Sequence, residues 1–265
     1  MNITRAVTVA ALAALAGCAT VSHPAPDTLI AYRGETKNAP ANTLRAFEQA
    51  VEYGFGFECD LRLTPDGKVC AFNDGTAQES KDPVSTRIED ILSLARPGRK
   101  IHLALRSGPE IVPAVRDALA AQSRANPNTA VLASAGKEVC RAAKDQLPGY
   151  GVLWIVDAAD ATAEQIVDGA REAGADGVVV KFDGDRLTEE FVAEVKRAGL
   201  SFHVWGVNDL SYALRSFAVG ADTVATDSAK TLYDEYCIVF APEMDRRDEF
   251  SDRMLDGGAP FQTIR

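Results

Sequence analysis

Histidine and cysteine are scarce in this chain, and neither occurs at the spacings that usually mark a catalytic or metal-binding cluster. There are 3 histidines and 5 cysteines in 265 residues, with no C-x-x-C and no mixed Cys/His cluster. A structural zinc site is therefore not indicated. The chain has no G-x-S-x-G elbow and no cysteine–histidine nucleophile arrangement. No glycine-rich dinucleotide fingerprint follows the first predicted strand.

Positive charge is also in short supply. Lysine and arginine together number 28 against 38 acidic residues, which gives a net charge of −10. A chain of this charge is a poor partner for nucleic acid or for an anionic lipid surface, although it is compatible with a cation-dependent site. The composition is otherwise that of a globular protein, with 46% hydrophobic residues. The length suits one large domain.

The apolar run near the amino terminus is too short to cross a bilayer comfortably. Arg5 precedes it, and it ends in the letters L-A-G-C at Cys18. These are the flanks of a secretory signal peptide, and the ending resembles a bacterial lipobox, whose cysteine becomes the lipid-carrying first residue. We predict a signal peptide over residues 1–17, lipidation of Cys18 and a tether over residues 18–27. A simple cleaved signal with a chance cysteine is the alternative.

The predicted lipid anchor places the protein in the bacterial cell envelope. Ala19 is not the aspartate that retains some lipoproteins at the inner membrane, which favours the outer membrane, facing the periplasm. In an oxidising compartment Cys59 and Cys70, on neighbouring hairpin strands, are candidates for a disulfide. Two buried free thiols are the alternative.

From residue 29 onward, short apolar β-branched runs alternate with amphipathic stretches, a pattern typical of βα units around a parallel sheet. The predicted strands are Leu29–Tyr32, Phe57–Leu61, Ile101–Leu105, Ala130–Ala133, Gly151–Val156, Gly177–Lys181, Phe202–Val207 and Thr223–Thr226. The predicted helices include Thr43–Tyr53, Ile111–Gln122, Ala163–Ala173 and Thr188–Ala198. About eight such units close an α/β TIM (β/α)8 barrel. An open doubly wound sheet is the alternative.

Two segments stand apart from this repeat. A hairpin over Arg62–Phe72 follows the second predicted strand and turns at Asp66-Gly67, so we expect a small insertion there. Residues 237–265 are polar and charged with no clear period, and we expect a loosely attached extension. The barrel is predicted over residues 28–236.

Several short motifs occur in a fixed order along the barrel. They are Tyr32-Arg33-Gly34, Pro40-Ala41-Asn42-Thr43, Glu58-Cys59-Asp60, Thr64-Pro65-Asp66-Gly67 and Asn73-Asp74, with a later F-H-V-W-G-V-N-D run from Phe202 and a closing Gly220-Ala221-Asp222 and Thr226-Asp227. In order and spacing they resemble the glycerophosphodiester phosphodiesterase family. That family's pattern reads H-R-G, P-E-N-T, E-x-D, T-x-D-G and H-D, then V-x-V-W-T-V-N-D and G-x-D…T-D.

The resemblance implies phosphodiester hydrolysis by two histidines and a divalent cation, which carboxylates of E-x-D and of a later L-E-x-K strand hold. Glu58 and Asp60 are retained, two positions apart on a strand, so both face the barrel mouth. Ala104 takes the place of the third carboxylate and Arg106 that of the lysine. We expect at most a weakly bound divalent cation, magnesium or calcium. An ion-paired or solvated acidic pair is the alternative.

The acid/base positions of the family are altered as well. Tyr32 and Asn73 stand where the family has histidines, and Ala41 replaces the glutamate of P-E-N-T. Tyrosine has an ordinary pKa of about 10 and asparagine does not titrate, so neither is poised near neutral pH. We therefore predict an impaired active site on an intact barrel.

None of the three histidines is predicted to replace the missing pair. His23 lies in the tether. His102 shares a strand face with Ala104, one layer deeper, and is predicted to be a satisfied core residue. His203 lies two residues before Trp205, where the family varies.

Arg33, Arg106 and Trp205 are the predicted ligand-binding residues. Arginine suits bidentate contact with phosphate, and Trp205 with Tyr32 would supply apolar walls. Pairing of Arg33 with Glu58 or Asp60 is the alternative. The leading hypothesis is an impaired family member that binds a phosphodiester or glycerophospho headgroup, or an envelope protein partner. An active metal-dependent phosphodiesterase and a structural envelope lipoprotein are the other two.

Overall fold

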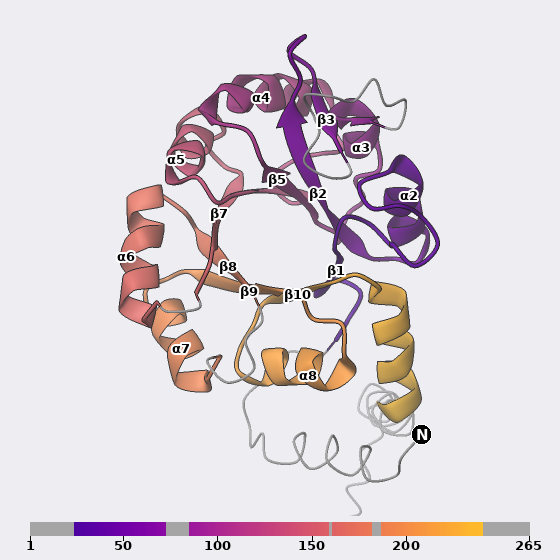
Figure 1. The fold of residues 1–265 in the computed structure, drawn as a ribbon, viewed down its shortest axis with the longest axis vertical. Coiled ribbons are helices and arrows are strands. Elements are labelled where there is room, and N and C mark those ends of the chain that lie inside the picture. Colours follow the sequence, from indigo (N-terminus) through magenta and orange to yellow (C-terminus); the bar gives the residue numbers. More distant parts are fainter. Residues whose placement is uncertain (1–23, 73–84, 159–160, 182–186, 241–265) are drawn as a thin grey trace, which may run out of the picture.

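Eight parallel strands form a closed ring in the computed structural model, which describes residues 24–72, 85–158, 161–181 and 187–240 (Figure 1). The strands are β1 (Leu29–Ala31), β2 (Gly56–Leu63), β5 (Ile101–Leu105), β6 (Ala130–Ser134), β7 (Gly151–Val156), β8 (Gly177–Lys181), β9 (Ser201–Trp205) and β10 (Thr223–Thr226). Each pairs with the next, and β1 pairs with both β10 and β2, which closes the sheet. The fold is a TIM barrel, as predicted.

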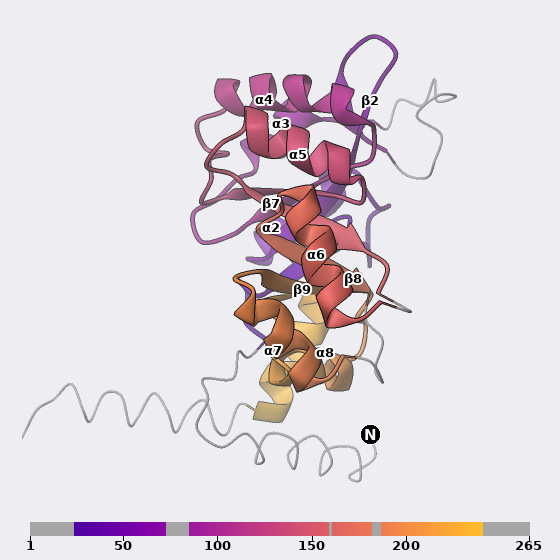
Figure 2. The same cartoon turned by 90° about the vertical axis from the view of Figure 1, so that its left-hand side faces the viewer.

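Helices lie outside the ring between successive strands. They are α2 (Leu44–Glu52), α3 (Ile88–Ser93), α4 (Val112–Ala121) after a short η1 turn (Pro109–Ile111), α5 (Lys137–Gln146), α6 (Ala163–Ala173), α7 (Glu189–Arg197) and α8 (Leu210–Ala218). Figure 2 shows α4, α5 and α6 along one side of the barrel. Local sequence sets several of their ends: Thr162 and Gln165 form a capping box at the start of α6, and Gly174, at a φ of 64°, ends it.

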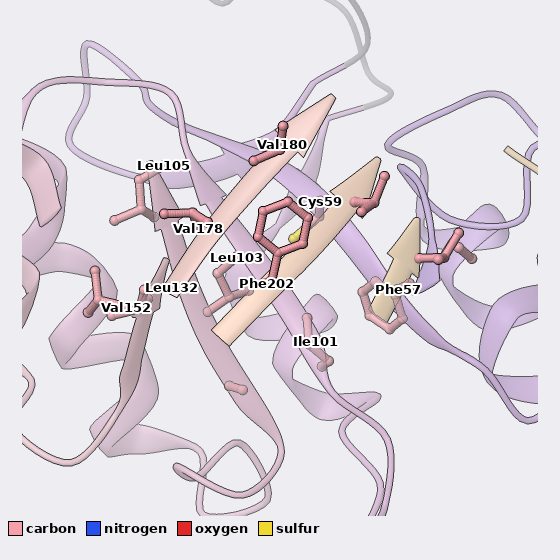
Figure 3. Close-up of a cluster of buried hydrophobic side chains, with 14 of the residues drawn as sticks. Phe57, Cys59, Ile101, Leu103, Leu105, Leu132, Val152, Val178, Val180 and Phe202 are labelled. Atoms are coloured by element: carbon pink, nitrogen blue, oxygen red, sulfur yellow. The ribbon is translucent and has the colours of Figure 1, made fainter. Parts of the chain in front are cut away.

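The strands alternate between two environments. On β5, Ile101, Leu103 and Leu105 belong to the hydrophobic core between sheet and helices, part of which Figure 3 shows. His102 and Ala104, between them in sequence, line the cavity inside the barrel. The two-residue period of a strand therefore sorts core residues outward and candidate site residues inward.

The predicted hairpin is an extension of the barrel strand itself. β2 continues to Leu63, the chain turns at Gly67 with a φ of 79°, and β3 (Val69–Ala71) returns antiparallel, followed by β4 (Thr86–Arg87). The register places Cys70 opposite Arg62, three residues beyond Cys59. Both cysteines are buried free thiols, so the disulfide alternative is not realised.

The carboxyl-terminal part of the barrel ends in a helix over residues 229–240. Tyr233 packs edge-on against Phe55, and Tyr236 lies 4.9 Å from Phe240, ring centre to ring centre. The helix crosses the boundary predicted between residues 236 and 237. The predicted signal peptide, Cys18, His23, Asn73 and residues 241–265 lie outside the described part of the chain. Within that part, no helix is both long and apolar enough to cross a membrane.

Candidate functional site

A cavity of about 370 Å3 opens inside the barrel. Two sides of this cavity differ in polarity. Charged side chains on β2 and just beyond the ends of β1 and β5 form one side, and they include Arg33, Glu58, Asp60 and Arg106. Small and apolar side chains from β6, β7 and β8 form the other, namely Ala133, Ile155 and Val179. The predicted binding and metal residues thus meet in one place, at the carboxyl-terminal end of the strands, where TIM barrels carry their sites.

Asp60 is the most heavily contacted of these residues. Arg33 Nε lies 2.7 Å from one carboxylate oxygen, and Arg106 Nε donates to the other. Asn42 Nδ2 donates to Asp60 at 3.2 Å, and Asn42 Oδ1 accepts from the backbone N–H of Asp60 at 3.0 Å. Burial favours the neutral acid, but the two arginine charges and these hydrogen bonds outweigh it and hold the pKa of Asp60 below its ordinary value.

Glu58 is in a different state, although it lies two residues away. One oxygen accepts from the backbone N–H of Arg33 at 3.1 Å. The other, Oε1, lies 3.7 Å from Arg106 Nη2 and has no hydrogen-bond partner in the described part of the chain. Burial, and then the negative charge of Asp60, raise the pKa of Glu58 to about 8. The two retained carboxyls therefore differ: the surroundings favour the charged form of Asp60 and the neutral form of Glu58.

The backbone around this pair adopts unusual conformations that position its contacts. Arg33 has a φ of 57° and Asn42 a φ of 59°, in the left-handed region that non-glycine residues seldom occupy. The bond from Arg33 N–H to Glu58 holds the first, and the two bonds between Asn42 and Asp60 hold the second. Strain of this kind persists where surrounding contacts over-determine it, and such places are often functional.

Sequence reasoning assigned no role to Asn42. Its signal was its place in Pro40-Ala41-Asn42-Thr43, directly before the cap of α2, where Thr43 accepts from Ala46 N–H. Two neighbouring residues of this motif thus have separate roles: Thr43 caps the helix, and Asn42 orients Asp60. Lys181 was also missed as a neighbour of the mouth, and its Nζ lies 5.6 Å from the ring centre of Trp205.

Tyr32 and Trp205 form an aromatic pair beside the charged residues. Their rings stack with centres 5.7 Å apart and planes 24° from parallel, and Arg33 Cζ lies 4.9 Å from the Tyr32 ring centre. The indole Nε1 of Trp205 is buried without a hydrogen-bond partner in the described residues. Burial, and then the charge of Glu58, raise the pKa of Tyr32, which moves it further from a group that exchanges protons near neutral pH.

The expectation for His102 requires a correction. It is buried, with 6% of its surface exposed, but it is not satisfied: Nε2 lacks a hydrogen-bond partner among the residues that the structure describes, and it faces the cavity. Its ring meets His203 edge-on, with centres 5.9 Å apart. His203 is held through both ring nitrogens, by Thr223 Oγ1 at 2.8 Å and Ser201 Oγ at 3.0 Å.

The residues present do not fit a divalent cation. Ala104 pairs in register with Asp60 and presents a methyl group where the family's third carboxylate would stand. Guanidinium groups already neutralise Asp60, and Arg106 reaches Glu58 as well. Within the described ranges no three His, Cys, Asp or Glu side chains gather as a ligand set. At these carboxylates the described residues instead form an internal ion-pair network.

Comparison with known proteins agrees with this geometry. The profile of the glycerophosphoryl diester phosphodiesterase family matches residues 33–95 and 96–231. A glycerophosphodiester phosphodiesterase from Caldanaerobacter subterraneus subsp. tengcongensis is 43% identical over 53 residues, which are 20% of this chain and 22% of that protein. The match thus spans about a fifth of that relative's length.

Solved structures resemble the whole barrel. A glycerophosphodiester phosphodiesterase from Parabacteroides distasonis is 18% identical, with a TM-score of 0.66 over 82% of this chain and 98% of that one. An Oleispira antarctica phosphodiesterase, solved with its product sn-glycerol-3-phosphate, is 20% identical, with a TM-score of 0.65 over 78% and 95% of the two chains. At this identity the likeness shows a shared fold. On the breadth of the profile match, the chain belongs to the glycerophosphoryl diester phosphodiesterase family.

Proposed function

We propose that this barrel binds a phosphate ester of glycerol at its mouth and that it hydrolyses such esters poorly, if at all. The observation that carries the proposal is the arrangement of Arg33. Its Nε pairs with Asp60, while no hydrogen bond or ion pair joins its two terminal amino groups to another described residue. They remain as donors at the rim of the cavity, in the planar geometry that suits an oxyanion.

The neighbours of Arg33 support an anion at this position. Arg106 lies on the other side of Asp60, and Trp205 adds a buried indole N–H that no described residue uses. Burial and the charge of Asp60 raise the pKa of Glu58, which leaves Asp60 as the main negative charge that the two guanidinium groups face. A bound phosphoryl group would meet a local excess of positive charge without a metal ion.

Impaired hydrolysis follows from the proton-transfer groups. Tyr32, in the place of one family histidine, has a raised pKa, and asparagine, the residue at position 73, does not titrate. Loss of one general acid or base usually costs about 10²–10⁴-fold in rate, and losses within one catalytic unit do not simply add. The alternative, an active metal-dependent phosphodiesterase, would need Glu58 and Asp60 to exchange their arginine partners for a cation.

Two measurements on the same protein test this proposal. Titration calorimetry with sn-glycerol-3-phosphate should show binding that EDTA does not change. Choline release from glycerophosphocholine, with magnesium or calcium, should be near background. The triple variant Tyr32→His/Asn73→His/Ala104→Glu should gain turnover that EDTA abolishes, because it restores both histidines and the third carboxylate.

The possible results separate the three hypotheses. Enzyme-like turnover by the natural protein would overturn impairment and favour the active phosphodiesterase. Absence of both binding and turnover would overturn the ligand-binding proposal and favour an envelope protein partner or a structural role.

We further propose that Cys18 carries a lipid that anchors the barrel to the envelope membrane, on the periplasmic side of the outer membrane. The L-A-G-C ending of the amino-terminal apolar run supports this. In bacterial cells, the full chain should partition with the outer-membrane fraction and Cys18→Ser should not. Equal partitioning of the two would count against lipidation.

A further inference from the structure

Two neighbouring residues in the cavity carry buried polar atoms that the proposed phosphate contact does not use. Glu58 Oε1 and His102 Nε2 both lack a hydrogen-bond partner among the described residues, and both residues line the same cavity. They are register partners on the adjacent strands β2 and β5, so their side chains leave the sheet next to each other on its inner face. Buried polar atoms without partners are rare, and each calls for an explanation.

Small residues leave space in front of these two atoms. Ala104 lies two residues beyond His102 on β5, and Ala133 is its register partner on β6. Both line the cavity with a methyl group only. A larger side chain at position 104 would extend over the His102 ring. The space is therefore a continuation of the cavity at the level of Asp60, one strand layer nearer the mouth than Glu58 and His102.

The surrounding contacts hold His102 in this orientation. Its ring meets the edge of His203, whose two nitrogens are engaged by Thr223 and Ser201. His203 therefore acts as a fixed support, while His102 Nε2 remains available. Glu58 is fixed in the same way, because its other oxygen accepts from the backbone N–H of Arg33.

The chemistry of the two atoms selects the group that can bind between them. A carboxyl oxygen and an imidazole nitrogen together are satisfied by a group that donates one hydrogen bond and accepts another, as a hydroxyl does. An anion would lie against the carboxyl of Glu58 and close to the charge of Asp60. An alkyl group would leave both polar atoms unpaired, which is unfavourable in a buried site.

We propose that Glu58 and His102 form a subsite for a hydroxyl group on the alcohol part of the phosphate ester, so that the barrel selects hydroxylated esters over alkyl esters. This inference rests on the proposed function, which places the phosphate at Arg33 and Arg106. Asp60 and Glu58 are two residues apart on one strand, about 6.6 Å at 3.3 Å per residue. A three-carbon ester can span this separation, with its phosphate at the mouth and a hydroxyl at the subsite.

Titration calorimetry with three probes tests the subsite apart from the phosphate contact. The probes are sn-glycerol-3-phosphate, 1-propyl phosphate with the same carbon skeleton and no hydroxyl, and inorganic phosphate. The natural protein should bind the glycerol ester roughly tenfold more tightly than the propyl ester, since the latter leaves both polar atoms unpaired. His102→Leu should remove this preference by weakening only the glycerol ester. His102→Gln, which keeps a polar group near the Nε2 position, should retain much of it.

A second variant guards against misfolding of the histidine variants. Ala104→Val fills the space without removing a polar atom, and it should also abolish the preference while inorganic phosphate still binds. Circular dichroism checks that each variant is folded. Equal affinity of the natural protein for the two esters, or a preference that survives in His102→Leu, would overturn the subsite alone. Failure of all three probes to bind would overturn the proposed function and the subsite with it.

Discussion

The two walls of the cavity are built on different physical principles. On β6, β7 and β8, Val131, Ala133 and Leu153 form a small hydrophobic cluster of their own, against which Ile155 and Val179 pack. At the carboxyl ends of β1, β2 and β5, by contrast, the charged side chains Arg33, Glu58, Asp60 and Arg106 are linked to one another, and Asp60 alone is held by two arginines and an asparagine.

The two sides should therefore differ in how strongly a mutation lowers stability and in which polar groups they offer to a ligand. Removal of one apolar side chain costs the contacts of that residue and leaves a void. Removal of one charged partner leaves a buried charge without compensation, which costs more than the pair itself contributes. The charged wall is thus the more fragile half, and it also holds the unpaired polar atoms that a ligand can use. Four predictions test this contrast, beginning with the largest effect.

Arg106→Met should lower the free energy of unfolding by about 3–5 kcal/mol, because Asp60 would lose a buried partner while the methionine keeps the packing of the side-chain stem. Chemical denaturation measures the loss. Arg116→Met is the matched control: Arg116 pairs with Asp117 on the surface, with 45% and 70% of the two side chains exposed, and its loss should change stability by at most about 1 kcal/mol. Similar losses in the two variants would contradict the interdependence of the charged wall.

Leu153→Ala on the apolar wall should cost about 2–3 kcal/mol, from lost contacts and the void that remains. Its effect on phosphate affinity should be negligible, because no charged contact changes. Ile238→Ala, at a position with 69% exposure, serves as the control and should leave stability nearly unchanged. A fall in phosphate affinity in Leu153→Ala would show that the two walls are coupled.

Acidification should destabilise the barrel through its buried histidines. Burial lowers the pKa of His102 from 6.5 to about 3, with smaller contributions from His203 and Lys100, and burial likewise lowers that of His203 to about 4. Between about pH 6.5 and these values the unfolded chain binds more protons than the folded one, so stability falls as the pH falls. Thermal unfolding of the natural protein and of His102→Leu over this window should show a shallower decline in the variant. If the stability of the two proteins fell equally with pH, His102 would not be buried in its neutral form.

Trp205→Phe should have the smallest effect. Phenylalanine can keep the stacking against Tyr32 but lacks the indole N–H, so stability should hardly change. Affinity for sn-glycerol-3-phosphate should fall roughly two- to tenfold, the range expected for one neutral hydrogen bond. Unchanged affinity would remove Trp205 from the proposed phosphate contact.

The barrel was predictable because its signals are local and repeat along the chain. Ile101–Leu105, Gly151–Val156, Gly177–Lys181 and Thr223–Thr226 were predicted with the bounds that the structure has. Each is a short run whose outward side chains are mostly apolar, a pattern typical of a buried strand. The predicted Phe202–Val207 instead begins at Ser201 and ends at Trp205, because strand ends depend on pairing that composition does not record.

The site was predicted in its members but not in its pairings. The family motifs brought Arg33, Glu58, Asp60 and Arg106 to one mouth, yet the alternatives for Arg33 stayed open, since nothing in the sequence says which oxygen a guanidinium will reach. In the structure Arg33 Nε pairs with Asp60, so the ion-pair alternative applies, while phosphate contact by the terminal amino groups stays a prediction. His102 was misjudged for the same reason: the satisfaction of a buried histidine depends on residues from three other strands, and sequence spacing does not describe them.

The ion pair between Arg106 and Asp60 has one more consequence. A metal ion binds reversibly from solution, so the occupancy of its site depends on the metal concentration in the compartment. A guanidinium is covalently part of the polypeptide, so a chelator cannot remove its positive charge and a competing ion cannot replace it. Under the proposed function, the affinity of the barrel for a phosphate ester should therefore not depend on the metal ions available to it.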